Sequence, residues 1–427
     1  MNRDNRSGKV FIVGAGPGDP GLMTIKGLER LRQADAVVYD RLINDELLSY
    51  CSGACEKIFV GKESGFHPIE QAEITEILIR KARQGLTVVR LKGGNPFVFG
   101  RGSEEAIGLK EAGIDFEIVP GITSGLSAPI YSGIPITHRG LITQCVLITA
   151  HESPEKEGTQ VDWDKLAKLK NTSLIIYMGA SRIGNICGEL VRYGMDRSTP
   201  AAVIENGTLP KQRTITGRLD TIAGQFKAMG FHAPAIIFIS PTVSMRDQLS
   251  WFETRPLFGK RIVISAEPDA LDSLRSIVSD LGGEEILIPV HPDSEATYVS
   301  RAEEIDHVDG NSIVGGFGRK DLLLEVSSMT RWRSVFTVVA PAPVRDWAEE
   351  IREKGADVFI FSTQASVEKF WDTLGHESAL GLLGRGVSIA TTREAADCLA
   401  CKSVRSTGIF TAGSLEQIRD LVLNIFS

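Results

Sequence analysis

A glycine-rich loop follows an apolar segment at Leu91-Lys92-Gly93-Gly94-Asn95-Pro96-Phe97-Val98-Phe99-Gly100-Arg101-Gly102. The residues before it, 85–91, are β-branched and apolar, which predicts a β-strand. Two adjacent glycines let the backbone pass close to a ligand, and Pro96 stiffens the turn. Because α/β proteins bind ligands where parallel strands end, this loop predicts a binding site with an arginine aimed at an anion.

The chain on either side alternates between strand-like and helix-like periodicity. We predict strands over 9–14, 36–39, 87–91 and 115–119, and helices over 24–33, 71–83 and 103–112. This order is typical of an α/β fold with a largely parallel sheet. Further strands over 144–150, 172–178, 200–205, 212–218 and 235–240 predict a second lobe with a mixed sheet. We therefore expect lobes over about 8–137 and 138–249.

A third domain is predicted after a break rich in proline and glycine. Residues 250–258 form the expected linker, and a fresh β-α-β pattern starts after it. Strands are expected over 260–265, 285–289, 356–362 and 386–390, with helices over 271–281 and 415–425. The smaller α/β domain would span 259–427.

Bulk composition narrows the class of protein. The chain has 427 residues, a formal net charge of −7 and 42% hydrophobic residues, which is typical of a globular protein and not of a nucleic-acid binder. No apolar run is long enough to span a bilayer, and the polar N-terminus does not resemble a signal peptide. We expect a cytoplasmic protein without membrane contact.

Six cysteines do not form a disulfide framework in a chain of this length. Cys398 and Cys401 form a single CxxC pair, which cannot complete a tetrahedral zinc site. We interpret the pair as small residues on a helix and predict no metal.

Glycine turns recur at predicted strand ends, at Gly14, Gly93, Gly121 and Gly179. The first of them lacks the third glycine of a dinucleotide fingerprint. Asp40 follows the second strand, where its carboxylate could act as a base or bind a ligand; taken alone, it is more often part of a surface ion pair. Lys62 follows a short strand and, taken alone, is more often a solvated lysine. His138, at the expected boundary between the lobes, is interpreted as structural, and Met178 by itself suggests a core residue.

Taken together, and in this order, these motifs resemble the tetrapyrrole (corrin/porphyrin) methylase family over about residues 8–253. The resemblance implies two α/β lobes with S-adenosylmethionine (SAM) in the cleft between them, usually in a homodimer. It implies SAM-dependent C-methylation of uroporphyrinogen III at C2 and C7, which gives precorrin-2, a precursor of siroheme and cobalamin.

The resemblance also assigns residues. Asp40 matches the proposed proton acceptor, Lys62 the proposed donor and Arg101 a substrate-facing arginine. Arg139 and Tyr177 are the further residues expected toward the substrate. The residues expected around SAM are Pro17, Gly93, Gly94, Asn95, Val98, Thr123, Ser124, Met178 and Gly207.

Asn95 is a departure, because the family usually has aspartate there. Loss of the carboxylate removes up to ~4 kcal/mol of gross Coulomb attraction to a cation ~4 Å away at an effective dielectric of ~20, with a smaller net value. We therefore expect one of two outcomes: SAM binds more weakly, or Asn95 binds it through its amide carbonyl.

Residues 259–427 resemble uroporphyrinogen-III synthase more weakly, and the middle of this domain, around 296–342, is shortened. We expect a degenerate domain. The alternatives are a bifunctional synthase and methyltransferase, and a methylase for a later corrin intermediate with a docking module that has no activity.

Overall fold

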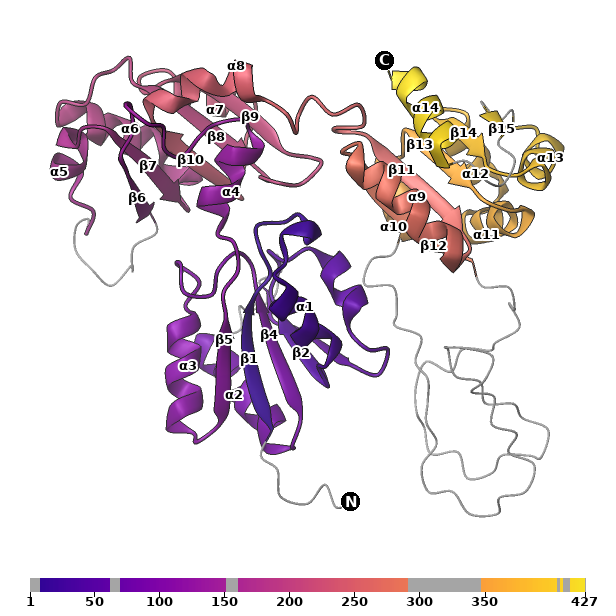
Figure 1. The fold of residues 1–427 in the computed structure, drawn as a ribbon, viewed down its shortest axis with the longest axis horizontal. Coiled ribbons are helices and arrows are strands. Elements are labelled where there is room, and N and C mark those ends of the chain that lie inside the picture. Colours follow the sequence, from indigo (N-terminus) through magenta and orange to yellow (C-terminus); the bar gives the residue numbers. More distant parts are fainter. Residues whose placement is uncertain are drawn as a thin grey trace.

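The structure is a computed structural model that describes residues 8–61, 70–150, 160–290, 347–404, 408–409 and 415–426. Three five-stranded sheets follow one another along the chain (Figure 1). We call the elements from β1 to β5 the first lobe, those from α4 to α8 the second lobe, and those from β11 to α14 the third domain. The predicted α/β class is confirmed.

The first lobe is a parallel sheet in the order β3-β2-β4-β1-β5. Its strands are β1 (Lys9–Gly14), β2 (Ala36–Tyr39), β3 (Glu56–Phe59), β4 (Thr87–Lys92) and β5 (Asp115–Val119). One face packs on α1 (Ile25–Arg32) and the 3-10 helix η2 (Asp45–Tyr50). The other face packs on α2 (Gln71–Arg83) and α3 (Gly102–Glu111). Because both faces are covered, the inner strands β1 and β2 are near-continuous apolar runs.

The second lobe has the mixed sheet that the sequence predicts. Its order is β6-β7-β10-β8-β9, with β6 and β7 parallel and the other pairs antiparallel. The strands are β6 (Gln144–Thr149), β7 (Thr172–Tyr177), β8 (Pro200–Glu205), β9 (Arg213–Arg218) and β10 (Ala235–Ile239). Helices α5 (Trp163–Lys168), α6 (Ile183–Arg192) and α7 (Ile222–Ala228) pack on one face of it. Helix α4 (Ser124–Tyr131) packs on the other face, and η4 (Pro241–Met245) and α8 (Arg246–Leu249) end the lobe.

The third domain is again a parallel sheet, in the order β12-β11-β13-β14-β15. Its strands are β11 (Arg261–Ala266), β12 (Glu284–Pro289), β13 (Val358–Phe361), β14 (Val387–Ala390) and β15 (Gly408–Ile409). Its helices are α9 (Pro268–Asp280), α10 (Trp347–Lys354), α11 (Gln364–Leu374), α12 (His376–Leu383), α13 (Arg393–Cys401) and α14 (Leu415–Phe426). The expected shortened middle, 296–342, lies outside the described residues.

Most predicted strands and helices match the structure within two residues. The predicted start of the helix at Leu271 is wrong, because α9 begins at Pro268. Proline is favoured in the first turn of a helix, where its missing N–H has no partner to lose. Cys398 and Cys401 lie on α13, as predicted, and the described residues contain no cluster of His, Cys, Asp and Glu that could hold a metal.

Within the described residues, no helix combines the length and apolar character that crossing a membrane requires.

Three glycines bring the carboxyl ends of neighbouring strands into backbone contact in the first lobe. A Cβ on Gly121 would lie 2.3 Å from the Gly94 carbonyl oxygen and 2.8 Å from Gly14 Cα. A Cβ on Gly14 would likewise lie 2.6 Å from the Gly94 oxygen. Side chains are thus excluded at this edge of the sheet, and the loops after β1, β4 and β5 pack as bare backbone.

We predict that Gly121→Ala strongly destabilises the protein. The new methyl group meets rigid backbone on two sides, so the cost should exceed the ~1–3 kcal/mol of ordinary overpacking. Chemical denaturation measures the free energy of unfolding. The matched control is Gly188→Ala in the middle of α6, where a Cβ meets nothing within 4 Å. That substitution should stabilise by ~0.5–1 kcal/mol, and a similar loss in both variants would contradict the packing argument.

Candidate functional site

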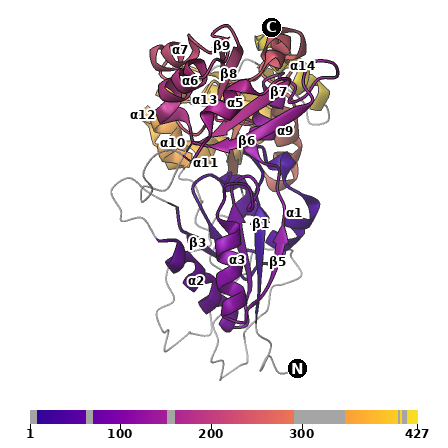
Figure 2. The ribbon, with the colours of Figure 1, turned by 90° about the vertical axis from the view of Figure 1, so that its left-hand side faces the viewer.

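A cavity of about 1790 Å³ lies at the carboxyl ends of the first-lobe strands. Loops from both lobes line it, and residues of α9, β12, α10 and α11 in the third domain complete its wall. Figure 1 shows the first sheet below the second lobe and the third domain, and Figure 2 shows the same layering from the side. Strand ends are where open α/β sheets place ligands.

Backbone forms the floor of the cavity. The loops after β1 and β4 pair through an isolated bridge in which the Gly94 N–H donates to the Gly16 carbonyl at 2.7 Å. Gly16 and Gly94 both have positive φ, +78° and +68°, which glycine adopts without steric cost. A Cβ at Gly94 would meet nothing closer than 3.8 Å, so this backbone is open on its outer side.

Strained backbone gathers around the same cavity. Phe99, Met178, Asn206 and Thr208 line it with φ between +50° and +74°. Positive φ is costly for residues other than glycine, above all for a β-branched threonine. Such residues concentrate at ligand sites, where the surrounding structure holds them. Met178 is 49% exposed, so the core position that its residue type suggests is wrong.

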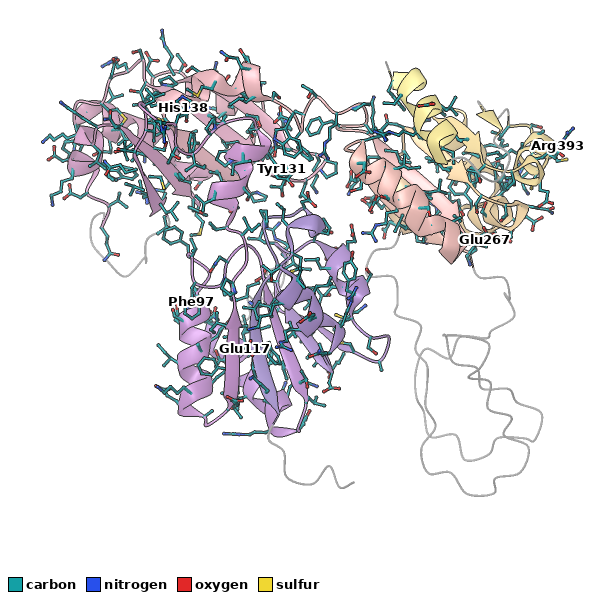
Figure 3. All side chains as sticks on the ribbon, in the orientation of Figure 1. Phe97, Glu117, Tyr131, His138, Glu267 and Arg393 are labelled. Carbon is teal, nitrogen blue, oxygen red and sulfur yellow. The ribbon has the colours of Figure 1, made fainter. Side chains whose placement is uncertain are left out.

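Hydrogen bonds between the lobes hold the two sides of the cavity together. The Tyr131 hydroxyl of α4, labelled in Figure 3, donates to Asp19 Oδ2 at 2.7 Å. The Asp19 N–H in turn donates to Thr208 Oγ1 at 3.0 Å. The loop after β1 is therefore fastened to the second lobe at two points.

Tyr177 caps α4 from the end of β7. Its hydroxyl accepts a hydrogen bond from the Gly125 N–H at 3.0 Å and pairs with Thr123 Oγ1 at 2.8 Å. Thr123, the N-cap residue, makes no capping bond of its own, so Tyr177 satisfies a helix N–H that has no partner within the helix. Burial raises the pKa of Tyr177, although both hydrogen bonds oppose the shift.

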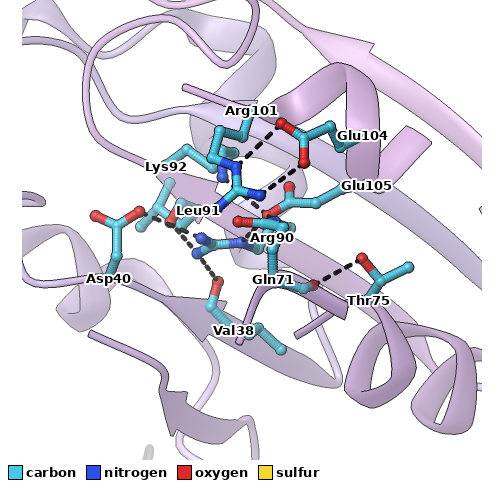
Figure 4. A network of polar contacts seen from close by, with 10 residues as sticks. All are labelled: Val38, Asp40, Gln71, Thr75, Arg90, Leu91, Lys92, Arg101, Glu104 and Glu105. Carbon is cyan, nitrogen blue, oxygen red and sulfur yellow. Dashed lines mark hydrogen bonds and ion pairs between the residues drawn. The ribbon is translucent and has the colours of Figure 1, made fainter. Parts of the chain in front are cut away.

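Asp40 stands at the cavity beside a buried ion network, drawn in Figure 4. Arg90 Nη2 lies 3.3 Å from Asp40 Oδ2, and Arg90 Nε donates to Glu105 Oε1 at 3.1 Å. The same Glu105 oxygen accepts from Lys92 Nζ at 2.9 Å and from Gln71 Nε2 at 2.7 Å. Burial and then the charge of Arg90 lower the pKa of Lys92.

The structure brings most of the predicted site residues to one cavity. Those that line it are Pro17, Asp40, Gly93, Gly94, Asn95, Val98, Thr123, Ser124, Tyr177, Met178 and Gly207. Lys62 lies outside the described residues.

Arg101 and Arg139 are not among the residues that line the cavity. Arg101 precedes α3 with φ +59°, and its guanidinium forks onto Glu104 at 3.0 and 2.8 Å. Arg139 is exposed in the turn next to His138, which Figure 3 shows on the second lobe. Their roles toward a substrate stay predictions.

Both ends of the Asn95 side chain are engaged within the loop. Its amide nitrogen donates to the Gly121 carbonyl at 2.9 Å, and its amide oxygen accepts from the Phe97 N–H at 2.9 Å. An aspartate could keep the second bond but not the first. Asn95 therefore braces the loop after β4 against the loop after β5.

Sequence reasoning missed Arg90, Lys92 and Glu105. The signal was present, because the predicted strand over 87–91 carries Arg90, and Lys92 follows two positions later on the same face. Buried charges need partners, and these partners lie on elements elsewhere in the chain.

The model of the Tetrapyrrole (Corrin/Porphyrin) Methylases matches residues 9–223, half of the chain. The chain belongs to this methylase family. A Uroporphyrinogen-III C-methyltransferase of Bacillus subtilis is 44% identical over 284 residues, which are 66% of this chain and 58% of the relative.

Two solved methylases extend the comparison. A cobalt precorrin-4 methyltransferase is 28% identical with a TM-score of 0.50, and the match covers 55% of this chain and 95% of that one. A uroporphyrin-III C-methyltransferase of Thermus thermophilus, solved with S-adenosyl homocysteine, is 37% identical with a TM-score of 0.47; coverage is 55% of this chain and 93% of that one. The chain spans about half to three fifths of the length of the curated relatives that it matches first.

We predict that Tyr177→Phe destabilises the methylase by ~1–3 kcal/mol, because a buried N–H of α4 loses its acceptor. Denaturant unfolding measures the change. Tyr193→Phe is the matched control, since the Tyr193 hydroxyl bonds Arg192 at an exposed position, where substitutions usually stay within ~0.5 kcal/mol. Equal effects of the two substitutions would argue against a capping role for Tyr177.

Proposed function

We propose that this methylase transfers methyl groups from SAM to carbon atoms of uroporphyrinogen III. The observation that carries the proposal is that the family motifs converge on one cavity, where glycine backbone, strained loop residues and Asp40 meet. The name of the Bacillus subtilis relative supports the choice of substrate.

The residues present fit SAM. The open backbone at Gly94 allows a ligand to approach closely, and the half-exposed Met178 offers an apolar contact. Pro17, Gly93, Asn95, Val98, Thr123, Ser124 and Gly207 are the further residues that we assign to the SAM side of the cavity. SAM supplies an electrophilic methyl group on a sulfonium.

Methyl transfer requires the protein to position the ring carbon against the methyl group and to supply one proton acceptor. A pyrrole carbon of the reduced ring forms the new C–C bond while the C–S bond breaks and its electron pair stays on sulfur. Holding the carbon ~3–3.5 Å from the methyl group accounts for much of the rate enhancement. The ring then loses a proton, and we assign its acceptance to Asp40, which Arg90 orients. Two such transfers, at C2 and C7, give precorrin-2.

The substrate carries eight carboxylates, and we propose that Arg101 and Arg139 bind some of them. We assign the role of proton donor to Lys62. Arginine suits this task because its planar fork binds carboxylates through two hydrogen bonds. Arg101 already holds the Glu104 carboxylate in that geometry.

A later corrin intermediate is the second candidate substrate. The fold likeness to a cobalt precorrin-4 methyltransferase favours it. The intermediate that gains mass in the assay below distinguishes the two.

For the remainder of the molecule we propose a methylase part over 1–249, a linker over 250–258, and a degenerate synthase-like domain over 259–427. We also propose a homodimer. Feeding hydroxymethylbilane to the full chain tests the bifunctional alternative, because only synthase activity yields uroporphyrinogen III from it.

We predict that the protein, incubated with SAM and uroporphyrinogen III, yields products heavier by one and then two methyl groups. Mass spectrometry of the tetrapyrrole measures the gain. The matched control is the Asp40→Asn variant, which keeps the shape of the side chain but removes the proton acceptor and should slow transfer by ~10²-fold or more. Absence of any mass gain with the unaltered protein would overturn the proposed function.

We predict that Arg101→Ala raises KM for uroporphyrinogen III by about tenfold and leaves the Kd for SAM within about twofold. The backbone at Arg101 is left-handed, with φ +59°, and this conformation is about as costly for alanine as for arginine. The change in KM therefore reports the loss of the guanidinium. Steady-state kinetics and calorimetry measure the two quantities, with the exposed Arg83→Ala on α2 as control. Equal loss of both affinities would contradict the assigned role.

A further inference from the structure

Lys92 is the last residue of β4 and lines the cavity immediately before the glycine loop. Arg90 pairs in register with Val38 of β2. Because side chains alternate along a strand, Lys92 shares the face of Arg90, and its register neighbour beyond Val38 is Asp40. Lys92 thus stands next to the assigned proton acceptor.

The ammonium group of Lys92 has bonding capacity to spare. Its side chain is 5% exposed, and the described residues provide it with one hydrogen-bond partner, Glu105 Oε1 at 2.9 Å. A lysine has three N–H donors. Glu105 is fully buried on α3, and its Oε1 also accepts hydrogen bonds from Arg90 and Gln71. Lys92 therefore shares its acceptor oxygen with two other donors.

A buried ion pair is weak evidence that Lys92 is there to stabilise the fold. Replacing buried ion pairs by apolar residues of similar size is often neutral or stabilises by ~1–4 kcal/mol. A buried, desolvated cation in a ligand cavity is instead a mark of a functional site. A carboxylate that enters the cavity would supply the acceptor that the remaining Lys92 donors lack.

We propose that Lys92 binds a carboxylate of the acidic tetrapyrrole at the inner end of the cavity, and that Glu105 is the positioning residue that aims its ammonium group. This assignment rests on the proposed function and adds to Arg101 and Arg139 a third cation, which unlike them lines the cavity. Figure 4 shows Lys92 and Arg90 together beneath Arg101, at the start of α3. The ring would then be held by a carboxylate close to Asp40, where its proton is lost.

The test is Lys92→Met, which keeps the length of the side chain and removes the charge. We expect KM for uroporphyrinogen III to rise about tenfold or more, while the Kd for SAM stays within about twofold. Binding of the stable oxidised ring, uroporphyrin III, followed by its fluorescence, should weaken in parallel without any turnover. If Lys92→Met does not fold, Lys92→Gln carries the same expectations.

The matched control is Lys81→Met on α2. Lys81 pairs at 2.6 Å with Glu56, the first residue of β3, at the amino ends of the strands and away from the cavity. Its loss should therefore change neither KM nor Kd. Glu105→Gln keeps the shape of the positioning residue and should raise KM about threefold without changing SAM binding.

An unchanged KM and unchanged uroporphyrin binding in folded Lys92→Met would overturn the inference, as would an equal loss of SAM affinity. An unchanged KM in Glu105→Gln would overturn the role of Glu105. These results differ from failure of the proposed function, in which the unaltered protein itself transfers no methyl group.

Discussion

The molecule depends on backbone contact among three glycines at the end of its central strands. β1 lies between β4 and β5, and Gly14 and Gly121 lie so close to each other and to the Gly94 carbonyl oxygen that neither admits a Cβ. This contact draws three loops into one floor. The Gly16–Gly94 bridge and the Asn95 side chain then fasten the loops together. Because the floor is backbone whose outer side at Gly94 carries no side chain, a ligand can approach it closely.

The same edge of the sheet also carries a cluster of charged side chains. Arg90 and Lys92 stand against Asp40 and Glu105, and three of these four side chains are nearly excluded from solvent. Such a cluster costs desolvation that its attraction offsets only when every bond is well made. Its value to the protein is that Asp40 and Lys92 are held in place before any ligand arrives, which lowers the cost of binding.

The third domain changes what the cleft offers to a ligand. Arg275 of α9 bonds Glu285 of β12 at 2.7 Å and also pairs with Glu46 of η2 in the first lobe. Burial raises the pKa of Glu285. Glu285, Glu350 and Glu368 line this side of the cavity. Glu285 pairs with Arg275, and Glu350 pairs with Arg261 and Lys354, so much of the negative charge on this wall is compensated within the third domain.

Local sequence determined a large part of this protein. Apolar runs ended by glycine gave strands and strand-end loops, and most candidate site residues follow those strands closely enough to be predicted. Other features depend on contacts between residues that lie far apart in the sequence. Asp40 lies 50 residues from Arg90, and Tyr177 lies 52 residues from the N–H that it caps, so no local pattern links them. Positive φ at Met178 and Thr208 opposes the preference of those residues. Sequence alone therefore determined the strands, their loops and the family, since these follow from local pattern; tertiary structure alone decided the buried ion network, the capping by Tyr177 and the strained loops, because contacts between distant segments outweigh local preference.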